Sequence, residues 1–238
     1  MKMPSNRLMV RVMAAASVIA MIFSICAAQD VSSANGIWAR GDLVILFARL
    51  NNCGAPYRPV QPLVSTDGGK TWGATGPRLE SSDLEYFLDT GSELFTAGED
   101  IAEGPAHSPF LLVYRATDNA WQQSEIYDQA SELLGIAVEA KTGRFLAWVR
   151  HLELKKDDWS GPVFLHRSLD GGKTWTVVRK VRRVPRMAPG LRFFREHLEQ
   201  SGSWRLTKTG SRAERRQDDG KWHLVTLLPL PIQEDCSN

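Results

Sequence analysis

Short apolar runs separated by turn-forming residues recur along most of the chain. The runs are rich in β-branched and aromatic side chains, a pattern that predicts β-strands. Three pairs of runs are each joined by a glycine-containing turn: Gly36–Arg40 with Leu43–Leu50, Leu84–Leu88 with Glu93–Ala97, and Leu134–Val138 with Arg144–Arg150. Only Asp128–Leu134 has the spacing of a helical turn. We therefore expect an all-β fold.

Two nearly identical octapeptides each follow a further apolar run. Ser65–Trp72 reads Ser-Thr-Asp-Gly-Gly-Lys-Thr-Trp, and Ser168–Trp175 differs from it only in the second residue, a leucine. Asp-Gly-Gly supplies residues that tolerate positive φ, as a tight turn requires. The aspartate carboxylate can accept hydrogen bonds from backbone N–H groups a few residues later, and the tryptophan can cover the sheet below. Each octapeptide therefore predicts a β-hairpin.

Two degenerate copies of the octapeptide complete a repeat. Thr117–Trp121 retains Asp118, and Gln217–Trp222 retains Asp219. The tryptophans of the four copies are 49, 54 and 47 residues apart. A period near 50 residues is typical of propeller arrays, so we expect about four four-stranded units that form a small or incomplete β-propeller. The fourth unit is expected to begin with a strand at Leu191–Phe194.

The octapeptide resembles the Asp-box, or bacterial neuraminidase repeat, of sialidases and of many non-enzymatic β-propellers. Two copies match the pattern Ser-x-Asp-x-Gly-x-x-Trp in full, and the spacing extends the resemblance over residues 30–230. In the families that carry it the box is structural. The resemblance therefore implies a structural role for Ser65, Asp67, Gly69, Trp72, Asp118, Trp121, Ser168, Asp170, Gly172, Trp175, Asp219 and Trp222.

A sialidase site is not evident in the sequence. Propellers of that family have six blades, and their site needs three arginines, a Tyr–Glu pair and an aspartate. The Phe-Arg-Ile-Pro signature is absent, and Tyr57-Arg58-Pro59 is only a partial match. None of the four tyrosines stands in a recognisable Tyr/Glu context, and a phenol without a partner is a poor nucleophile. We assign no catalytic residue.

The N-terminus has the form of a secretory signal. Three basic residues lead into an almost wholly apolar segment, Val12–Ile25, which ends at Cys26-Ala27-Ala28. We expect residues 1–28 to be removed, a single domain over 29–238, and a periplasmic or secreted protein; a retained membrane anchor is the alternative. Export favours a disulfide between Cys53 and Cys236, and two free thiols are the other interpretation.

Charge is distributed unevenly along the chain. Residues 167–216 hold 14 basic and 4 acidic side chains, whereas residues 29–166 hold 11 basic and 19 acidic. The basic stretch Arg179–Arg186 lies between the third and fourth units, and its arginines could bind carboxylates or phosphates of a partner. A solvated linker is the alternative. The candidate partner-binding residues are Arg179, Arg182, Arg183 and Arg186.

Other chemistry finds little support in the sequence. The Gly-Lys-Thr of each octapeptide lacks the upstream glycine of a phosphate-binding loop, and Val64 and Arg167 stand in that position. The five histidines show no metal-ligand spacing. We expect no metal, no cofactor and no nucleic-acid partner, and no membrane contact after signal cleavage.

Two functions from different classes remain. The first is an exported, non-catalytic recognition protein that binds another macromolecule, a protein or a glycan, and in one form inhibits a secreted or periplasmic enzyme. Rigid sheets that present variable loops suit such a role. The second is a sialidase-like glycoside hydrolase, or a sugar-binding derivative of one. Arginines converging with a tyrosine and a carboxylate at the propeller axis would favour the second.

Overall fold

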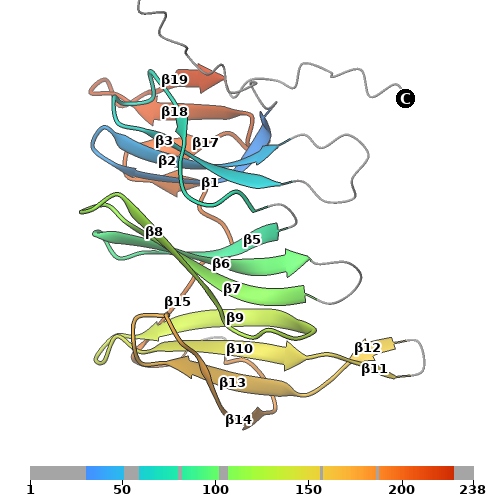
Figure 1. The fold of residues 1–238 in the computed structure, drawn as a ribbon. Helices are drawn as coiled ribbons and strands as arrows, with labels where there is room; N and C mark the ends of the chain where they lie inside the picture. The colour runs from blue at the N-terminus through green and yellow to red at the C-terminus, as the bar shows by residue number, and fades with distance from the viewer. Residues whose placement is uncertain are drawn as a thin grey trace, which may run out of the picture.

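The computed structural model describes residues 31–50, 59–79, 82–101, 107–155, 158–185 and 188–227. Within these ranges the chain is all-β and forms antiparallel sheets (Figure 1). The described residues contain no helix that could cross a membrane. Residues 1–28, Cys53, Cys236, Tyr57, Arg58 and Arg186 lie outside the described residues.

The strands group into four consecutive units of four, in agreement with the period of the repeat. Unit 1 contains β1 (Val31–Arg40), β2 (Leu43–Leu50), β3 (Val60–Ser65) and β4 (Gly73–Ala74). Unit 2 contains β5 (Ser82–Asp89), β6 (Glu93–Ile101), β7 (His107–Arg115) and β8 (Ala120–Glu125). Unit 3 contains β9 (Ser131–Glu139), β10 (Phe145–His151), β13 (Val163–Ser168) and β14 (Thr176–Val181). Unit 4 contains β16 (Gln200–Ser201), β17 (Trp204–Leu206), β18 (Arg212–Arg216) and β19 (Trp222–Leu227).

Three further strands lie outside the units. A hairpin of β11 (Glu153–Lys155) and β12 (Asp158–Ser160) extends from unit 3, and β15 (Leu191–Phe193) pairs with β9. The sheets of units 2 and 3 are joined into one by the pairing of β7 with β9, which consists of a single residue pair, His107 with Ser131.

Two expectations from the sequence are wrong. No helical turn forms at Asp128–Leu134, because β9 begins at Ser131 and its residues are paired with β10. The run at Leu191–Phe194 does not begin unit 4, because β15 pairs with unit 3 instead. The first strand of unit 4 is the two-residue β16.

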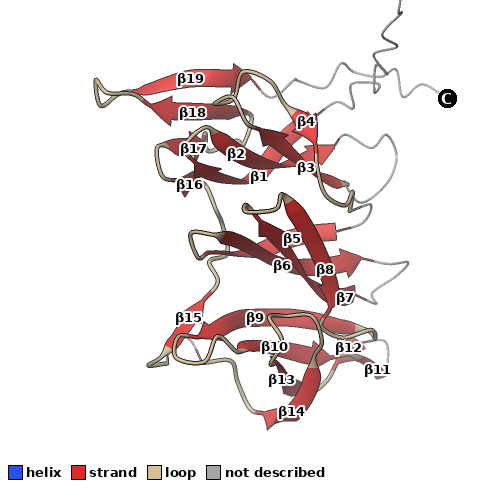
Figure 2. Cartoon of the chain, turned by 60° about the vertical axis from the view of Figure 1, so that its left-hand side comes forward, coloured by secondary structure: helices blue, strands red, loops and turns tan. Residues whose placement is uncertain are grey.

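The units stack in the order 4, 1, 2, 3, and unit 4 packs on unit 1 although the two are far apart in the sequence (Figures 1 and 2). Alternation along β2 explains why unit 1 is an inner layer. Val44, Leu46 and Ala48 face unit 4, whereas Ile45 and Phe47 face unit 2. A strand buried on both faces is apolar at nearly every position rather than at every second one, as the sequence of β2 is.

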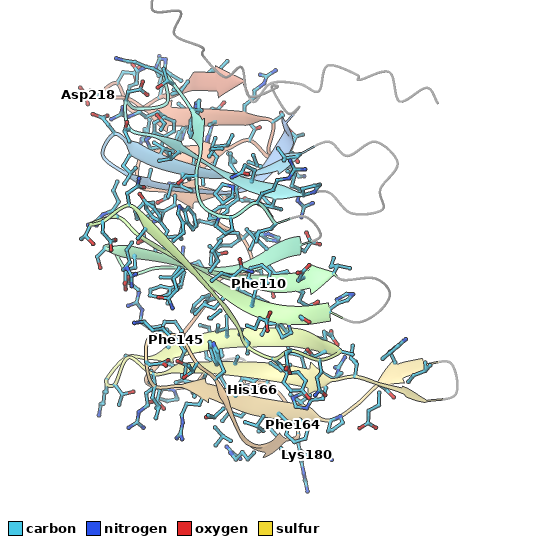
Figure 3. All side chains as sticks on the ribbon, in the orientation of Figure 1. Phe110, Phe145, Phe164, His166, Lys180 and Asp218 are labelled. Atoms are coloured by element: carbon cyan, nitrogen blue, oxygen red, sulfur yellow. The ribbon has the colours of Figure 1, made fainter. Side chains whose placement is uncertain are left out.

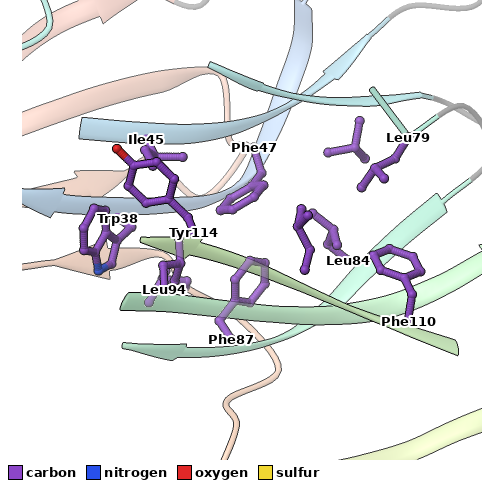
Figure 4. Close-up of a cluster of buried hydrophobic side chains, with 12 residues drawn as sticks. Trp38, Ile45, Phe47, Leu79, Leu84, Phe87, Leu94, Phe110 and Tyr114 are labelled. Atoms are coloured by element: carbon purple, nitrogen blue, oxygen red, sulfur yellow. The ribbon is translucent and has the colours of Figure 1, made fainter. Parts of the chain in front are cut away.

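Aromatic side chains fill the layer between units 1 and 2 (Figure 4). Trp38 meets Tyr114 edge-on, with the ring centroids 5.8 Å apart. Phe47 lies 5.6 Å from Phe87. A separate cluster between units 2 and 3 contains Phe95 and Phe145, whose centroids are 5.0 Å apart. Among the described residues, no buried cluster joins unit 3 to unit 4, and no closure into a ring is detected there.

A connector, residues 188–199, runs from unit 3 back to unit 4 along the first strands of the other units. It pairs with β9 through β15, then with β5 through Arg195 and Phe87, then with β1 through Leu198 and Gly36. Leu198 is buried in the layer between units 1 and 2. The connector therefore follows the first strands β9, β5 and β1 in turn before the chain enters unit 4.

Candidate functional site

The two octapeptides form the same hydrogen-bonded turn. Asp67 accepts bonds at Oδ1 from the backbone N–H groups of Lys70 and Thr71, both at 3.0 Å, and at Oδ2 from the Thr71 hydroxyl at 2.7 Å. Ser65 donates to Asp67 at 2.8 Å and accepts from the backbone N–H of Gly69 at 2.8 Å. Bonds from Thr71 hold the pKa of Asp67 well below its usual range.

Ser168–Trp175 repeats this network position by position. Asp170 accepts from the backbone of Lys173 at 3.1 Å and of Thr174 at 3.0 Å, and its pKa is likewise held well below the usual range, chiefly by Thr174. Both tryptophans donate from Nε1 to the second glycine of their turn, Trp72 to Gly69 and Trp175 to Gly172, at 3.1 Å each. The side chains thus satisfy backbone groups of their own turn.

The degenerate copies do not reproduce the network. Asp118 lies 3.6 Å from Arg115, and Trp121 donates to Thr75 of unit 1 at 2.9 Å. Asp219 accepts from the backbone of Lys221 at 2.9 Å. The guanidinium of Arg205 lies over the ring of Trp222, with its central carbon 4.3 Å from the ring centroid. These two turns are held by contacts that the octapeptide pattern does not predict.

An inner cleft of about 610 Å³ opens at the other end of the units. Successive strands of a unit are antiparallel, so the octapeptide turns, which join third to fourth strands, lie at the end opposite the start of β1 and β5. The cleft is bounded by those starts, the end of β2, the connector and the β17–β18 turn. Its charged residues include Arg49, Asp83, Glu85, Glu196, Glu199 and Lys208.

Two β-bulges direct polar residues into the inner cleft. In β1 the register with β2 shifts between Ala34 and Gly36, which leaves Asn35 as the extra residue. In β5 the register with β6 shifts between Leu84 and Tyr86, which leaves Glu85 as the extra residue. Bulges reorient side chains and are common beside active sites. Because of the bulge, the adjacent residues Glu85 and Tyr86 both line the cleft instead of facing opposite sides.

The surroundings of Glu85 favour its protonated form. The side chain is exposed to solvent, yet partial desolvation is the largest cause that raises its pKa, to about 7. The negative charges of Glu99 and Asp83, and then of Glu132 and Glu196, raise it further. A carboxyl group with a pKa near neutrality can both give and take a proton at physiological pH.

The neighbouring groups are fixed by polar contacts. Asp83 forms an ion pair with Arg49 across units 1 and 2, at 2.7 Å. Tyr86 donates to the carbonyl of Leu133 at 3.3 Å, and burial raises the pKa of its phenol. The buried Oδ1 of Asn35 has no hydrogen-bond partner within the described part of the chain.

A second concave surface lies on the outer face of unit 3, where the described residues place part of the connector but no other unit. This groove has a volume of about 1270 Å³ and a floor that includes Leu146, Trp148 and Leu165. Three of the four predicted partner-binding arginines line it, Arg179, Arg182 and Arg183, together with Lys180. Lys180 lies at the unit 3 end of the molecule, remote from Asp218 of unit 4 (Figure 3).

The sequence located the octapeptide turns and the basic stretch but not the inner cleft. Glu85 and Tyr86 are adjacent, yet the register shift that brings both into the cleft leaves no mark in the sequence pattern. Within the described ranges, no group of three or more His, Cys, Asp and Glu residues is arranged to hold a metal ion.

Comparisons with known proteins give similarity of fold alone. No protein-family model and no curated protein matches the chain. The Penicillium chrysogenum α-L-arabinanase, solved with arabinobiose, is 10% identical and aligns over 82% of this chain with a TM-score of 0.39. A mutant of Trypanosoma rangeli sialidase that displays trans-sialidase activity is 13% identical, also over 82%, with a TM-score of 0.34. The chain spans 63% and 35% of these two proteins.

Proposed function

We propose that the inner cleft binds a glycan and that Glu85 is the general acid of a glycoside hydrolase reaction. The observation that supports this most is the bulged Glu85 in the cleft, with a pKa raised to about 7 among other carboxylates. Glycoside hydrolysis usually requires two carboxyl groups in different protonation states, one to donate a proton and one ionised.

In this reaction Glu85 donates its proton to the glycosidic oxygen as the bond to the anomeric carbon breaks. Water adds to that carbon, and a second carboxylate accepts the proton that the water loses. Asp83 and Glu196 line the same cleft and are the candidates for this role. The Arg49–Asp83 ion pair keeps the Asp83 carboxylate in a fixed place.

The substrate is proposed to be a neutral or cationic sugar rather than a sialoside. Four of the six charged residues named in the cleft are acidic, and Arg49 is already paired with Asp83. A sialate carboxylate would therefore meet repulsion instead of an arginine cluster. Tyr86 is also poorly suited to be a nucleophile, because burial raises the pKa of its phenol and Leu133 occupies its hydroxyl.

The test is hydrolysis of a panel of aryl glycosides that includes neutral sugars, amino sugars and a sialoside. We expect Glu85→Gln to lower kcat by about a hundredfold or more on the sugar that is turned over. Glu125→Gln, at the end of β8, is the matched control and should leave the rate unchanged. Sugar binding without turnover, lost in Glu85→Gln, would indicate a sugar-binding derivative. Neither binding nor turnover of any panel member would refute the proposal.

A second proposed function, recognition of another macromolecule, is favoured by a separate observation. The basic side chains around the groove on unit 3 have no acidic partners within the described residues, and no unit covers the face on which they lie. This function uses a different surface from the inner cleft, and both could operate in one molecule.

A further inference from the structure

We infer that the groove on the outer face of unit 3 docks an acidic segment of a partner protein that carries apolar anchor residues. This inference rests on the second proposed function, recognition of another macromolecule at this groove. The groove lies apart from the inner cleft, so the inference does not depend on the proposed glycan chemistry.

The sequence of β10 indicates that this face is built to be covered. Phe145, Ala147 and Val149 face unit 2, whereas Leu146 and Trp148 face the groove. Five consecutive apolar residues are the pattern of a strand buried on both faces, as β2 is between its two neighbouring units. For β10 the second layer is not another unit: Val181 and Val184, with Leu191 and Phe193 of the connector, pack on this face, and the groove lies beside them.

Unit 4, at the opposite end of the array, carries charged side chains that pair with one another. Strands β17, β18 and β19 of unit 4 carry Arg205, Glu214 and Trp222. Arg205 is paired with Glu214 at 2.7 Å and lies over the ring of Trp222. Charged side chains that form ion pairs within one unit do not require a partner protein. Polar outer faces are typical of terminal repeats in stacked arrays. The outer face of unit 4 is therefore mostly polar, although Leu224, paired with Glu214, is exposed on it.

The charges on the groove set the chemistry of its occupant. Arg179, Lys180, Arg182 and Arg183 are exposed, and none of their side chains has a hydrogen bond or ion pair within the described residues. Arginines elsewhere, such as Arg150 with Glu132, form ion pairs. Four unpaired cations in one groove favour carboxylates on the partner and disfavour a second copy of the same basic face.

The floor favours a protein over a polyanionic glycan. Trp148 is only 4% exposed and stacks on Phe193 of the connector, with centroids 5.6 Å apart, so its ring is not free to stack on a sugar. The rest of the floor is aliphatic and includes Leu165, Val181 and Val184. Aliphatic floors bind apolar side chains, and a basic rim steers acidic ones.

The experiment selects peptides from a random linear display library on the full chain. The test variant carries Arg179→Glu, Lys180→Glu, Arg182→Glu and Arg183→Glu. The control carries the same change of charge at four exposed lysines in turns, Lys70→Glu, Lys141→Glu, Lys173→Glu and Lys221→Glu. A third variant, Leu165→Ser, changes the floor alone, and circular dichroism establishes that each variant is folded.

We expect the selected peptides to be acidic and to contain leucine or aromatic residues. Their affinity should fall at least about tenfold in the test variant and in Leu165→Ser, but not in the control or in Glu85→Gln. Three results would each overturn the inference: peptides without acidic residues, equal affinity for test and control variants, or heparin bound more tightly than any peptide and independently of Leu165. Self-association that is lost in the test variant would also overturn it, since the occupant would then be a second copy.

Discussion

Asn35 and Glu85 are the extra residues of two β-bulges at equivalent positions of neighbouring first strands, and both line the inner cleft. The same shift occurs in β9, where Leu134 is the extra residue. The bulge is therefore part of the repeat, and units 1 and 2 place a polar residue there. The repeat supplies the geometry of the cleft, and the identity of the bulged residue supplies its chemistry.

The raised pKa of Glu85 predicts how pH changes stability. The folded-state pKa of about 7 lies above the ordinary value of 4.5, so the folded state retains a proton that the unfolded state loses in this interval. The stabilisation of the folded state by this proton is fully present below about pH 4.5 and is lost as the pH rises through about 7. Glu85→Gln should therefore be more stable than the wild type near pH 8 and equal to it near pH 4. Urea unfolding at the two pH values measures this.

The octapeptide turns predict a contrast between two adjacent glycines. A Cβ on Gly172 would lie 2.3 Å from Cδ2 of Leu111 in unit 2, whereas a Cβ on Gly171 would meet nothing within 4 Å. Both have positive φ, 89° and 75°. Gly171→Ala should therefore cost about 1–2 kcal/mol from the left-handed backbone alone.

Gly172→Ala should cost a further 1–3 kcal/mol or so, because Leu111 must move in a packed interface. Thermal or urea unfolding of the two variants gives the comparison. Equal losses would mean that the turn does not pack against unit 2 as described. The same contrast is expected in unit 1, where a Cβ on Gly69 would lie 2.7 Å from the Trp204 ring of unit 4.

Local and long-range features of this chain differ in how far the sequence predicts them. The octapeptide turns were predictable, because Asp67 and Asp170 bond only to residues within four positions of themselves. The stacking order was not, because it depends on contacts such as that between Gly69 and Trp204, 135 positions apart. The inner cleft depends on the register between β5 and β6, where apolar residues occupy both faces and alternation gives no signal.

Trp175 should contribute more to stability than any exposed residue of unit 3. Its ring lies 6.3 Å from that of Phe145 and packs on the cluster between units 2 and 3. Because the side chain is only half-buried, we expect Trp175→Ala to cost roughly 2–4 kcal/mol, below the range for a fully buried tryptophan. Val178→Ala, at a position 41% exposed on β14, should change the free energy of unfolding by less than about 0.5 kcal/mol. A loss no larger for Trp175→Ala than for this control would contradict the packing.

The pair His151 and His166 predicts a loss of stability in acid. Their Nε2 atoms are 2.9 Å apart, and His151 is stacked between Tyr127 and Phe164, at centroid distances of 4.0 and 4.3 Å. Burial, and then His151, lower the pKa of His166 to about 4; burial also lowers the pKa of His151. The unfolded histidines bind protons near pH 6.5, so their contribution is present above that pH and is lost as the pH falls towards about 4.

The double variant His151→Gln, His166→Gln isolates this contribution from that of Glu85, which has the opposite sign. We expect the wild type to lose more stability than the double variant between about pH 7.5 and pH 4.5, measured by urea unfolding. His223→Gln is the control, since His223 is accessible to solvent and contacts Asp219 in the β18–β19 turn. If the double variant and the wild type lost the same stability over this interval, the two imidazoles would not be held neutral between units 2 and 3. A loss confined to the wild type would show that protonation of the two imidazoles causes it, because protonation places two positive charges where one shared hydrogen bond had been.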